Sequence, residues 1–189
     1  SPFFLNRGYA IVPISIAPIA LMAALTAVGA FIKIPLPYIP ITLQMPFVCL
    51  AGLLLGPWRG ATSQVVYLVT GLVGFPVFAK GGGPQYVLEP SFGYLLGFIA
   101  GACICGLVAG PAPGFWRALL AAWAGMLAIY AAGVVVLYLN LRFVAESDPD
   151  IAHTLQLGLS PLPKDLLVGL LAAWVAVRLR RRLRTDCSA

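Results

Sequence analysis

Charged residues are scarce in this sequence. Asp, Glu, Lys and Arg make up only 10% of the 189 residues, whereas 61% are hydrophobic. A water-soluble domain carries about 25% charged residues, because its surface must be hydrated. The shortage of charge excludes an ordinary soluble domain and predicts a surface that mostly faces lipid.

Groups suited to metal binding and catalysis are scarce as well. The chain has a single histidine, His153, and no G-x-x-x-x-G-K-[ST] segment. One histidine cannot form a His-His metal pair. The G-x-x-x-x-G-K-[ST] segment forms a loop that binds ATP phosphates, so a chain without it cannot bind ATP in that way. We therefore expect no metal site, and we expect any ATP-driven step to come from another subunit. A small membrane enzyme remains a remote alternative, for which Ser63 or Ser91 would need a partner base.

Long uncharged segments dominate what is present. About 20 apolar residues are needed to cross a bilayer, and proline- or glycine-rich stretches separate the segments here. The sequence predicts an all-α integral membrane protein, with residues 1–189 forming a single domain and one bundle of six transmembrane helices. The expected helices cover residues 10–32, 41–55, 61–77, 91–110, 118–139 and 163–180.

Three segments between the expected helices are predicted to be loops. Residues 33–44 hold three closely spaced prolines, which remove N–H donors and favour extended backbone. Residues 80–85 read KGGGPQ, a composition that favours open backbone. Both are candidate binding loops. Residues 142–160 contain three of the six acidic residues, so we expect a solvated loop there.

Positive charge is distributed unevenly between the two ends of such a bundle. With six spans, both termini share a side that holds eight of the twelve lysines and arginines, five of them between residues 178 and 184. Lysine and arginine are enriched on the cytoplasmic side of membrane proteins. We therefore predict cytoplasmic termini in a multi-pass protein of the bacterial inner membrane. A nucleic-acid partner is not expected, because the arginines adjoin a span and do not form a folded basic face.

Small residues recur at a four-residue spacing on two of the expected helices. Gly93, Gly97 and Gly101 lie on one face of the fourth helix, which favours close packing inside the bundle. The first helix carries two alanine pairs with the same spacing, which suit either an internal contact or docking onto a partner helix. These alanines are Ala20, Ala23, Ala24 and Ala27.

Five segments of the chain match one known family in order and spacing. They read IPLPYIPITLQ (34–44), AGLLLGPWRGA (51–61), GLVGFPVFAKGGG (71–83), EPSFGYLLGF (89–98) and PLPKD (161–165). Together they resemble the BioY family, the biotin-specific S components of energy-coupling-factor (ECF) vitamin transporters. The resemblance runs from about residue 20 to residue 174.

The resemblance implies a function as well as a fold. It implies a six-helix membrane subunit that binds biotin near the outer face, under the loops after the first, third and fifth helices. Biotin is then the transported ligand, and neither a cofactor nor enzymatic chemistry is expected. The implied partners are membrane lipid and the ECF energising module, with its transmembrane coupling protein and ATPase subunits; the alternative is a chain that works alone. An S component for a different vitamin is the alternative.

The chemistry of biotin and the resemblance together indicate where the ligand binds. The ureido group of biotin has two N–H donors, and a carboxylate such as Asp165 accepts hydrogen bonds of this kind strongly. The alternative is that Asp165 only complements the positive end of the last helix. Family members usually carry a lysine three residues later, where this chain has Val168. Lys164 is the nearest amine for the carboxylate of biotin, with Lys33 and Lys80 as alternatives.

The remaining candidates for ligand contact are polar or glycine residues near the outer side. Backbone N–H groups of the glycine-rich loop are expected to take part, because glycine supplies no side chain. Each polar side chain suits a role at the membrane interface or in packing equally well. These candidates are Gly81, Gly82, Gln44, Gln85, Tyr86 and Tyr94.

Overall fold

Helices form most of the structure. The computed structural model describes residues 16–36, 39–144 and 150–186, and six helices of these segments make up the bundle that the sequence predicts. These helices are α1 (Ile16–Phe31), α2 (Met45–Leu55), α3 (Pro57–Leu72), α4 (Phe92–Ala109), α5 (Phe115–Phe143) and α7 (Leu162–Asp186). The smaller elements are the strands β1 (Lys33–Ile34) and β2 (Ile41–Thr42), the 3-10 helix η2 (Pro84–Leu88) and the short helix α6 (Ile151–Gly158).

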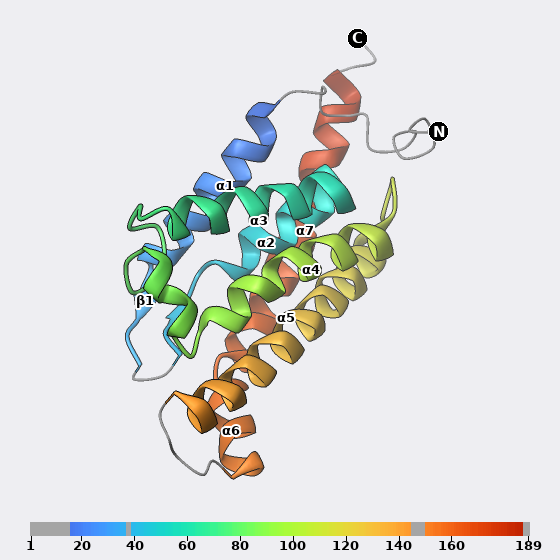
Figure 1. Cartoon of the computed structure of the whole chain (residues 1–189). Helices are drawn as coiled ribbons and strands as arrows, with labels where there is room; N and C mark the ends of the chain where they lie inside the picture. Colours follow the sequence, from blue (N-terminus) through green and yellow to red (C-terminus); the bar gives the residue numbers. More distant parts are fainter. Residues whose placement is uncertain (1–15, 37–38, 145–149, 187–189) are drawn as a thin grey trace, which may run out of the picture.

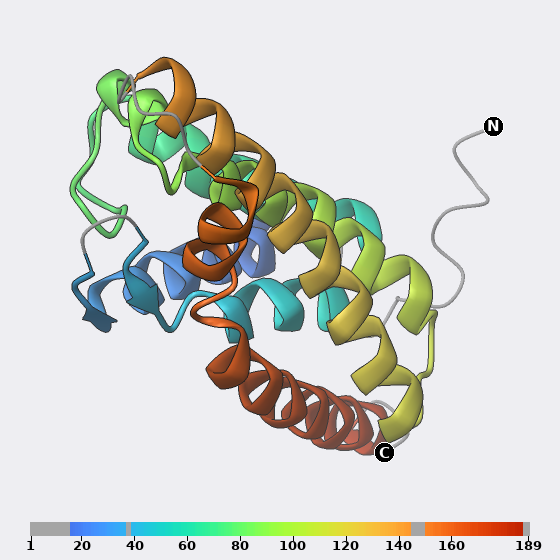
Figure 2. The same cartoon turned by 90° about the horizontal axis from the view of Figure 1, so that it is seen from below.

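The short helix α2 lies in the middle of the bundle (Figure 2). It contacts α1, α3, α4, α5 and α7. Its residues Val48, Ala51 and Leu53 have no exposed surface. A helix surrounded in this way needs apolar residues on all sides, which is why α2 has no charged residue.

Helices α4 and α5 run side by side (Figure 1). Gly97 makes this possible, since a Cβ atom at this position would lie 2.8 Å from the Cα of Ile129 on α5. Gly93 and Gly101 also face α5. The predicted packing role of this glycine series is confirmed.

The two ends of the molecule differ in composition. The β1–β2 hairpin, η2 and α6 lie toward one end, here called the loop end (Figure 1). The start of α1, the α4–α5 turn and the end of α7 lie toward the opposite end. We call this the arginine end, because Arg178, Arg180, Arg181 and Arg182 lie there on α7. Which end faces the cytoplasm stays a prediction.

The outer surface of the bundle is largely apolar. Leu127 on α5 is 73% exposed and Leu167 on α7 is 69% exposed, and many other large apolar side chains also face outward. By length and hydropathy, α4 and α5 are long enough to span a membrane, whereas the described parts of α1 and α2 are apolar but shorter. An apolar surface of this extent marks contact with lipid or with another protein.

Several predicted helix boundaries were wrong. The third helix covers Pro57–Leu72 instead of 61–77, because Gly56 turns the chain at φ 84° and proline is well tolerated in the first turn of a helix. The second helix starts at Met45 instead of residue 41, because β2 pairs with β1. The first helix ends at Phe31, and residues 10–15 of its predicted range lie outside the described residues.

The predicted loops contain more structure than expected. α5 extends to Phe143 instead of residue 139, and α6 lies within the segment predicted as a solvated loop, with Thr154 and Gly158 buried. Helix α6 forms because it packs against α5. α7 continues to Asp186 instead of residue 180, since arginine favours helix. Pro84 opens η2, so the glycine-rich loop is shorter than predicted.

Candidate ligand-binding site

A cavity of about 520 Å³, including space open to solvent, lies at the loop end. Apolar side chains make most of the wall, and a few polar groups interrupt it. The lining residues are Ile39, Pro40, Thr42, Gln44, Met45, Ala79, Tyr86, Ser91, Tyr94, Leu95, Phe98, Tyr130, Pro161, Lys164 and Asp165.

Asp165 supplies the buried carboxylate of this cavity. It lies in the first turn of α7 and is only 3% exposed. Its Oδ2 accepts a hydrogen bond of 2.6 Å from the hydroxyl of Tyr130, whereas Oδ1 is buried without a hydrogen-bond partner. Buried polar atoms in native proteins are nearly always paired. A carboxylate oxygen has two lone pairs, so Oδ1 can accept a hydrogen bond from a donor on a ligand.

Lys164 places a positive charge next to Oδ1 of Asp165. Its Nζ lies 2.6 Å from Oδ1 of Asp165, in an ion pair that does not have hydrogen-bond geometry. The same ammonium group donates to the backbone carbonyl of Thr42 on β2. An ammonium group has three N–H donors, so the lysine retains a donor for a ligand. The two neighbouring residues thus offer one acceptor and one donor side by side.

The other two candidate lysines do not line the cavity. Lys80 forms an exposed ion pair with Glu89 at 2.8 Å. Lys33 donates to the backbone carbonyl of Ala79, which belongs to the cavity wall. Val168 is half-buried and packs against the core. Lys164 is therefore the one lysine among the described residues that lines the cavity.

Gln44 connects three segments around the cavity. Its Nε2 donates to the hydroxyl of Tyr67 at 2.6 Å, and its Oε1 accepts from the hydroxyl of Thr42 at 3.0 Å. The Tyr67 hydroxyl donates in turn to the carbonyl of Val77 at 3.1 Å. Gln44 lines the cavity as predicted, but its amide already holds β2, α3 and the following loop together.

Two tyrosines that the sequence singles out also line the cavity. The Tyr94 hydroxyl donates to the carbonyl of Gly158 at 2.7 Å, which holds the end of α6 against α4. The Tyr86 hydroxyl lies 3.4 Å from the hydroxyl of Ser91, and burial raises the pKa of this tyrosine above its ordinary value. Tyr86 therefore contributes a neutral hydroxyl group to the cavity.

The structure does not bring three predicted residues to the cavity. Gly81, Gly82 and Gln85 are absent from its lining. Gln85 donates instead to the carbonyl of Gly82 at 2.7 Å. Gly81 has φ 118° and pairs with Phe78, which is buried against Tyr86 with ring centroids 4.5 Å apart. The glycine-rich loop therefore shapes the wall through Phe78.

The four candidate docking alanines lie on different faces of α1. Ala20 and Ala24 are exposed, Ala27 is half-buried and packs against the core, and Ala23 is buried in it. Ala23 is therefore an internal packing residue in this structure. Leu21 and Val28 lie exposed on the same helix. Ala20 and Ala24 remain candidates for contact with a partner helix.

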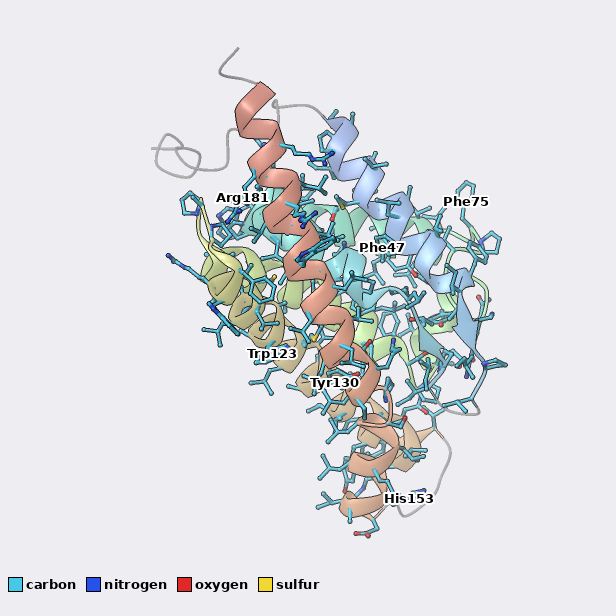
Figure 3. The ribbon with its side chains drawn as sticks, turned by 180° about the vertical axis from the view of Figure 1, so that it is seen from behind. Phe47, Phe75, Trp123, Tyr130, His153 and Arg181 are labelled. Carbon is cyan, nitrogen blue, oxygen red and sulfur yellow. The ribbon has the colours of Figure 1, made fainter. Side chains whose placement is uncertain are left out.

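The most informative residue that sequence reasoning missed is Tyr130. It lies in the middle of the apolar helix α5 and points toward the start of α7 (Figure 3). A phenol within an apolar span needs a hydrogen-bond partner, and this requirement is the signal that could have identified it. Ser91 and Thr42 were also missed as lining residues, because serine and threonine near a loop carry no distinctive pattern.

The arrangement gives no support to a serine-based enzyme. The Ser63 hydroxyl donates to the carbonyl of Gly60 inside the bundle. His153 lies exposed on α6, well away from the labelled Tyr130 at the cavity (Figure 3). No hydrogen bond joins either candidate serine to this histidine within the part of the chain that the structure describes.

Comparisons with known proteins agree on one family. Residues 9–185 match the model of the BioY family. The "Probable biotin transporter BioY" of Lysinibacillus sphaericus is 43% identical over 175 residues, which cover 91% of this chain and 89% of that protein. The "Biotin transporter BioY" of Thermotoga maritima is 39% identical over 163 residues, covering 85% and 92% of the two chains.

A solved structure shows the same fold. It is the crystal structure at 2.1 Å of "the S-component for biotin from an ECF-type ABC transporter", with a TM-score of 0.76. The match covers 88% of this chain and 90% of that one, at 24% identity. The chain is therefore a membrane protein that belongs to the BioY family, a family of transport components and not of enzymes.

Proposed function

We propose that this chain binds biotin at the loop end and mediates its uptake as the S component of an ECF transporter. The observation that carries the proposal is the ion pair in the cavity wall, in which the buried Oδ1 of Asp165 accepts no hydrogen bond and lies beside the ammonium group of Lys164. The names of the curated relatives and the fold of the solved S component support biotin as the ligand.

The acceptor and donor at this point complement a ureido group. A cyclic urea presents N–H donors next to a carbonyl acceptor. Oδ1 of Asp165 can accept from an N–H group while Nζ of Lys164 donates to the adjacent carbonyl, because the two protein atoms are only 2.6 Å apart. Charge-assisted hydrogen bonds of this kind are about twice as strong as neutral ones. We therefore assign both residues to the ureido end of biotin.

This assignment gives Lys164 a different role from the one that the sequence suggested. An amine held against Asp165 serves the ureido end better than a carboxylate at the far end of the ligand. The apolar side chains of Met45, Leu95 and Phe98 line the cavity and suit the bicyclic ring of biotin. Lys33 is then the candidate for the carboxylate, since it is anchored to the wall residue Ala79.

The proposed transport direction depends on the orientation in the membrane. We infer that the loop end faces outward and the arginine end faces the cytoplasm of a bacterial inner membrane, since arginine is enriched on the cytoplasmic side. The proposed partners are membrane lipid and an energising module of coupling protein and ATPase subunits. The exposed alanines of α1 suit a close helix–helix contact with the coupling protein.

Titration of the purified protein with a panel of vitamins tests the ligand. Isothermal calorimetry should show saturable binding of biotin and no binding of thiamine or riboflavin, which lack a cyclic urea with two N–H donors fused to an apolar thioether ring. Binding of another vitamin in preference to biotin would favour the alternative S component. A protein that retains its fold but binds none of them would contradict the proposal.

Thiol labelling in intact cells tests the orientation. In a cysteine-free background, His153→Cys on α6 should react with a membrane-impermeant maleimide, because this position is exposed at the loop end. Gly114→Cys in the α4–α5 turn is the matched probe, and it should react only after the membrane is permeabilised. The reverse pattern would contradict uptake from the loop end.

A further inference from the structure

A second hollow lies at the arginine end, on the opposite side of the molecule from the cavity described above. It encloses about 530 Å³, including open space, between the α4–α5 turn and the last part of α7. Its walls are residues 111–114 of the turn and Val177, Arg180 and Arg181 of α7. Figure 3 shows Arg181 beside this turn. The hollow therefore combines an apolar wall with two guanidinium groups.

Arg180 makes this hollow a fixed feature of the fold. It is only 7% exposed, and its guanidinium group donates to the carbonyls of Pro111 in the turn and Leu53 near the end of α2. The C-terminal carbonyls of a helix carry partial negative charge, which a guanidinium group stabilises. The arginine thus ties α7 to α2 and to the turn and holds the two walls of the hollow together.

The surroundings of the hollow are positively charged. Arg178 and Arg182 lie on the same part of α7, and Arg117 lies just after the turn. The acidic residues whose side chains the structure describes, Glu89, Asp150 and Asp165, all lie at the loop end. Charge complementarity therefore favours an anionic occupant.

Aromatic and apolar groups around the hollow indicate the depth of the membrane interface. Trp116 is 75% exposed directly after the turn, and Trp174 is 47% exposed one turn before Arg178, whose guanidinium lies 4.4 Å from the ring centroid. Tryptophan is enriched where lipid headgroups meet acyl chains. Leu120 and Leu127 extend the exposed apolar surface along α5. A molecule in the hollow can therefore lie along this surface with an apolar tail.

We propose that this hollow binds the headgroup phosphate of an anionic phospholipid. The guanidinium group of Arg181 contacts the phosphate, and Arg180 fixes the wall behind it. The acyl chains lie along the exposed apolar residues of α5. A zwitterionic lipid carries the same phosphate with a compensating cation, so the surrounding arginines select against it.

Native mass spectrometry of the detergent-solubilised protein tests this proposal with phosphatidylglycerol and phosphatidylcholine. Phosphatidylglycerol should bind at least tenfold more tightly. Arg181→Gln should weaken its binding by about ten- to a hundredfold, the value of one charged hydrogen bond. Arg182→Gln is the matched control, because it removes the same charge from a residue outside the hollow. Its effect should not exceed about fivefold, the value of general attraction between one arginine and an anionic surface.

Several results would overturn the site. Equal losses in the two variants would show general charge attraction only. Binding of glycerol phosphate as tight as that of the lipid would show a site for free phosphate. Unchanged lipid binding in Arg181→Gln, together with reduced co-purification with the energising module, would assign the surface to a protein partner. Biotin affinity should be unchanged in both variants, because the hollow and the cavity lie at opposite ends, and this measurement confirms that the variants are folded.

Discussion

Tyr130→Phe removes the hydrogen bond that orients the central carboxylate of the site. The Tyr130 hydroxyl donates to Oδ2 of Asp165 at 2.6 Å, and both side chains are buried. The substitution retains the aromatic ring and its edge-to-face contact with Tyr94, whose centroid lies 5.8 Å away. It therefore changes one hydroxyl group and leaves the packing of the cavity wall in place.

The effect on affinity should be smaller than the full value of the hydrogen bond. A hydrogen bond to a charged group contributes about 1.5–3 kcal/mol, but this one is present before and after the ligand binds. Most of its loss should lower the stability of the protein. The part that affects binding is the lost orientation of Oδ1, for which we expect about 1–2 kcal/mol, or a 5- to 30-fold weaker Kd for biotin.

A double-mutant cycle measured by calorimetry separates orientation from packing. If Tyr130 acts through Asp165, adding Tyr130→Phe to Asp165→Asn should weaken biotin binding by less than about threefold. Tyr94→Phe is the matched control, since it removes a phenol hydroxyl bonded to the carbonyl of Gly158 at the same cavity. The control should lower stability with little change in Kd. The same loss of affinity from Tyr130→Phe in both backgrounds would refute the reasoning.

Three further predictions concern the ligand, the partner and the fold. Lys164→Ala should weaken biotin and biotin amide equally, by about tenfold, if the lysine serves the ureido end; a loss confined to the acid would assign it to the carboxylate. Ala24→Leu should abolish co-purification with a membrane partner and leave biotin affinity unchanged, because Ala24 is exposed. Ala23→Leu should instead destabilise the protein, because Ala23 is buried. Normal association of the Ala24 variant would exclude the exposed face of α1 as the docking surface. Gly97→Ala should reduce the free energy of unfolding by about 1–3 kcal/mol, because the added Cβ would press on Ile129. Gly114→Ala is the control and should have little effect, because a Cβ at that position meets open space. Equal effects on the unfolding temperature would contradict close packing of α4 and α5.

The sequence predicts some elements of the fold well because their boundaries are marked by strong local signals. α4 lies within one residue of its predicted range at both ends, since Pro90 and Pro111 bracket an uncharged run. The start of α3 was misplaced because Trp58, Arg59 and Gly60 read as part of a turn. α6 was missed because its stability comes from packing against α5, which local sequence does not show.

The candidate site could be predicted in part for similar reasons. Asp165 stands out as a lone acid at the start of an apolar helix, and the structure places it in the cavity wall. Neighbouring helix positions point about 100° apart, so helix geometry alone does not bring Lys164 to the face of Asp165. Its long, flexible side chain instead brings Nζ to within 2.6 Å of the carboxylate. Tyr130 comes from a helix 35 positions away in sequence, and only the fold brings it to Asp165.

Titration of wild-type protein and of Asp165→Asn with biotin tests the central claim most directly. The substitution retains the shape of the side chain and replaces one accepting oxygen by an NH₂ donor. In one orientation of the amide this donor faces the ureido N–H groups, and in the other it faces the Tyr130 hydroxyl, which then loses its acceptor. The binding free energy of biotin should become weaker by about 2–4 kcal/mol, which is a 30- to 1,000-fold weaker Kd. The ligand-free variant should still unfold in one cooperative transition, with only a small change in its unfolding temperature. Unchanged biotin affinity in a folded Asp165→Asn protein would show that the carboxylate serves only the start of α7, and it would contradict the account.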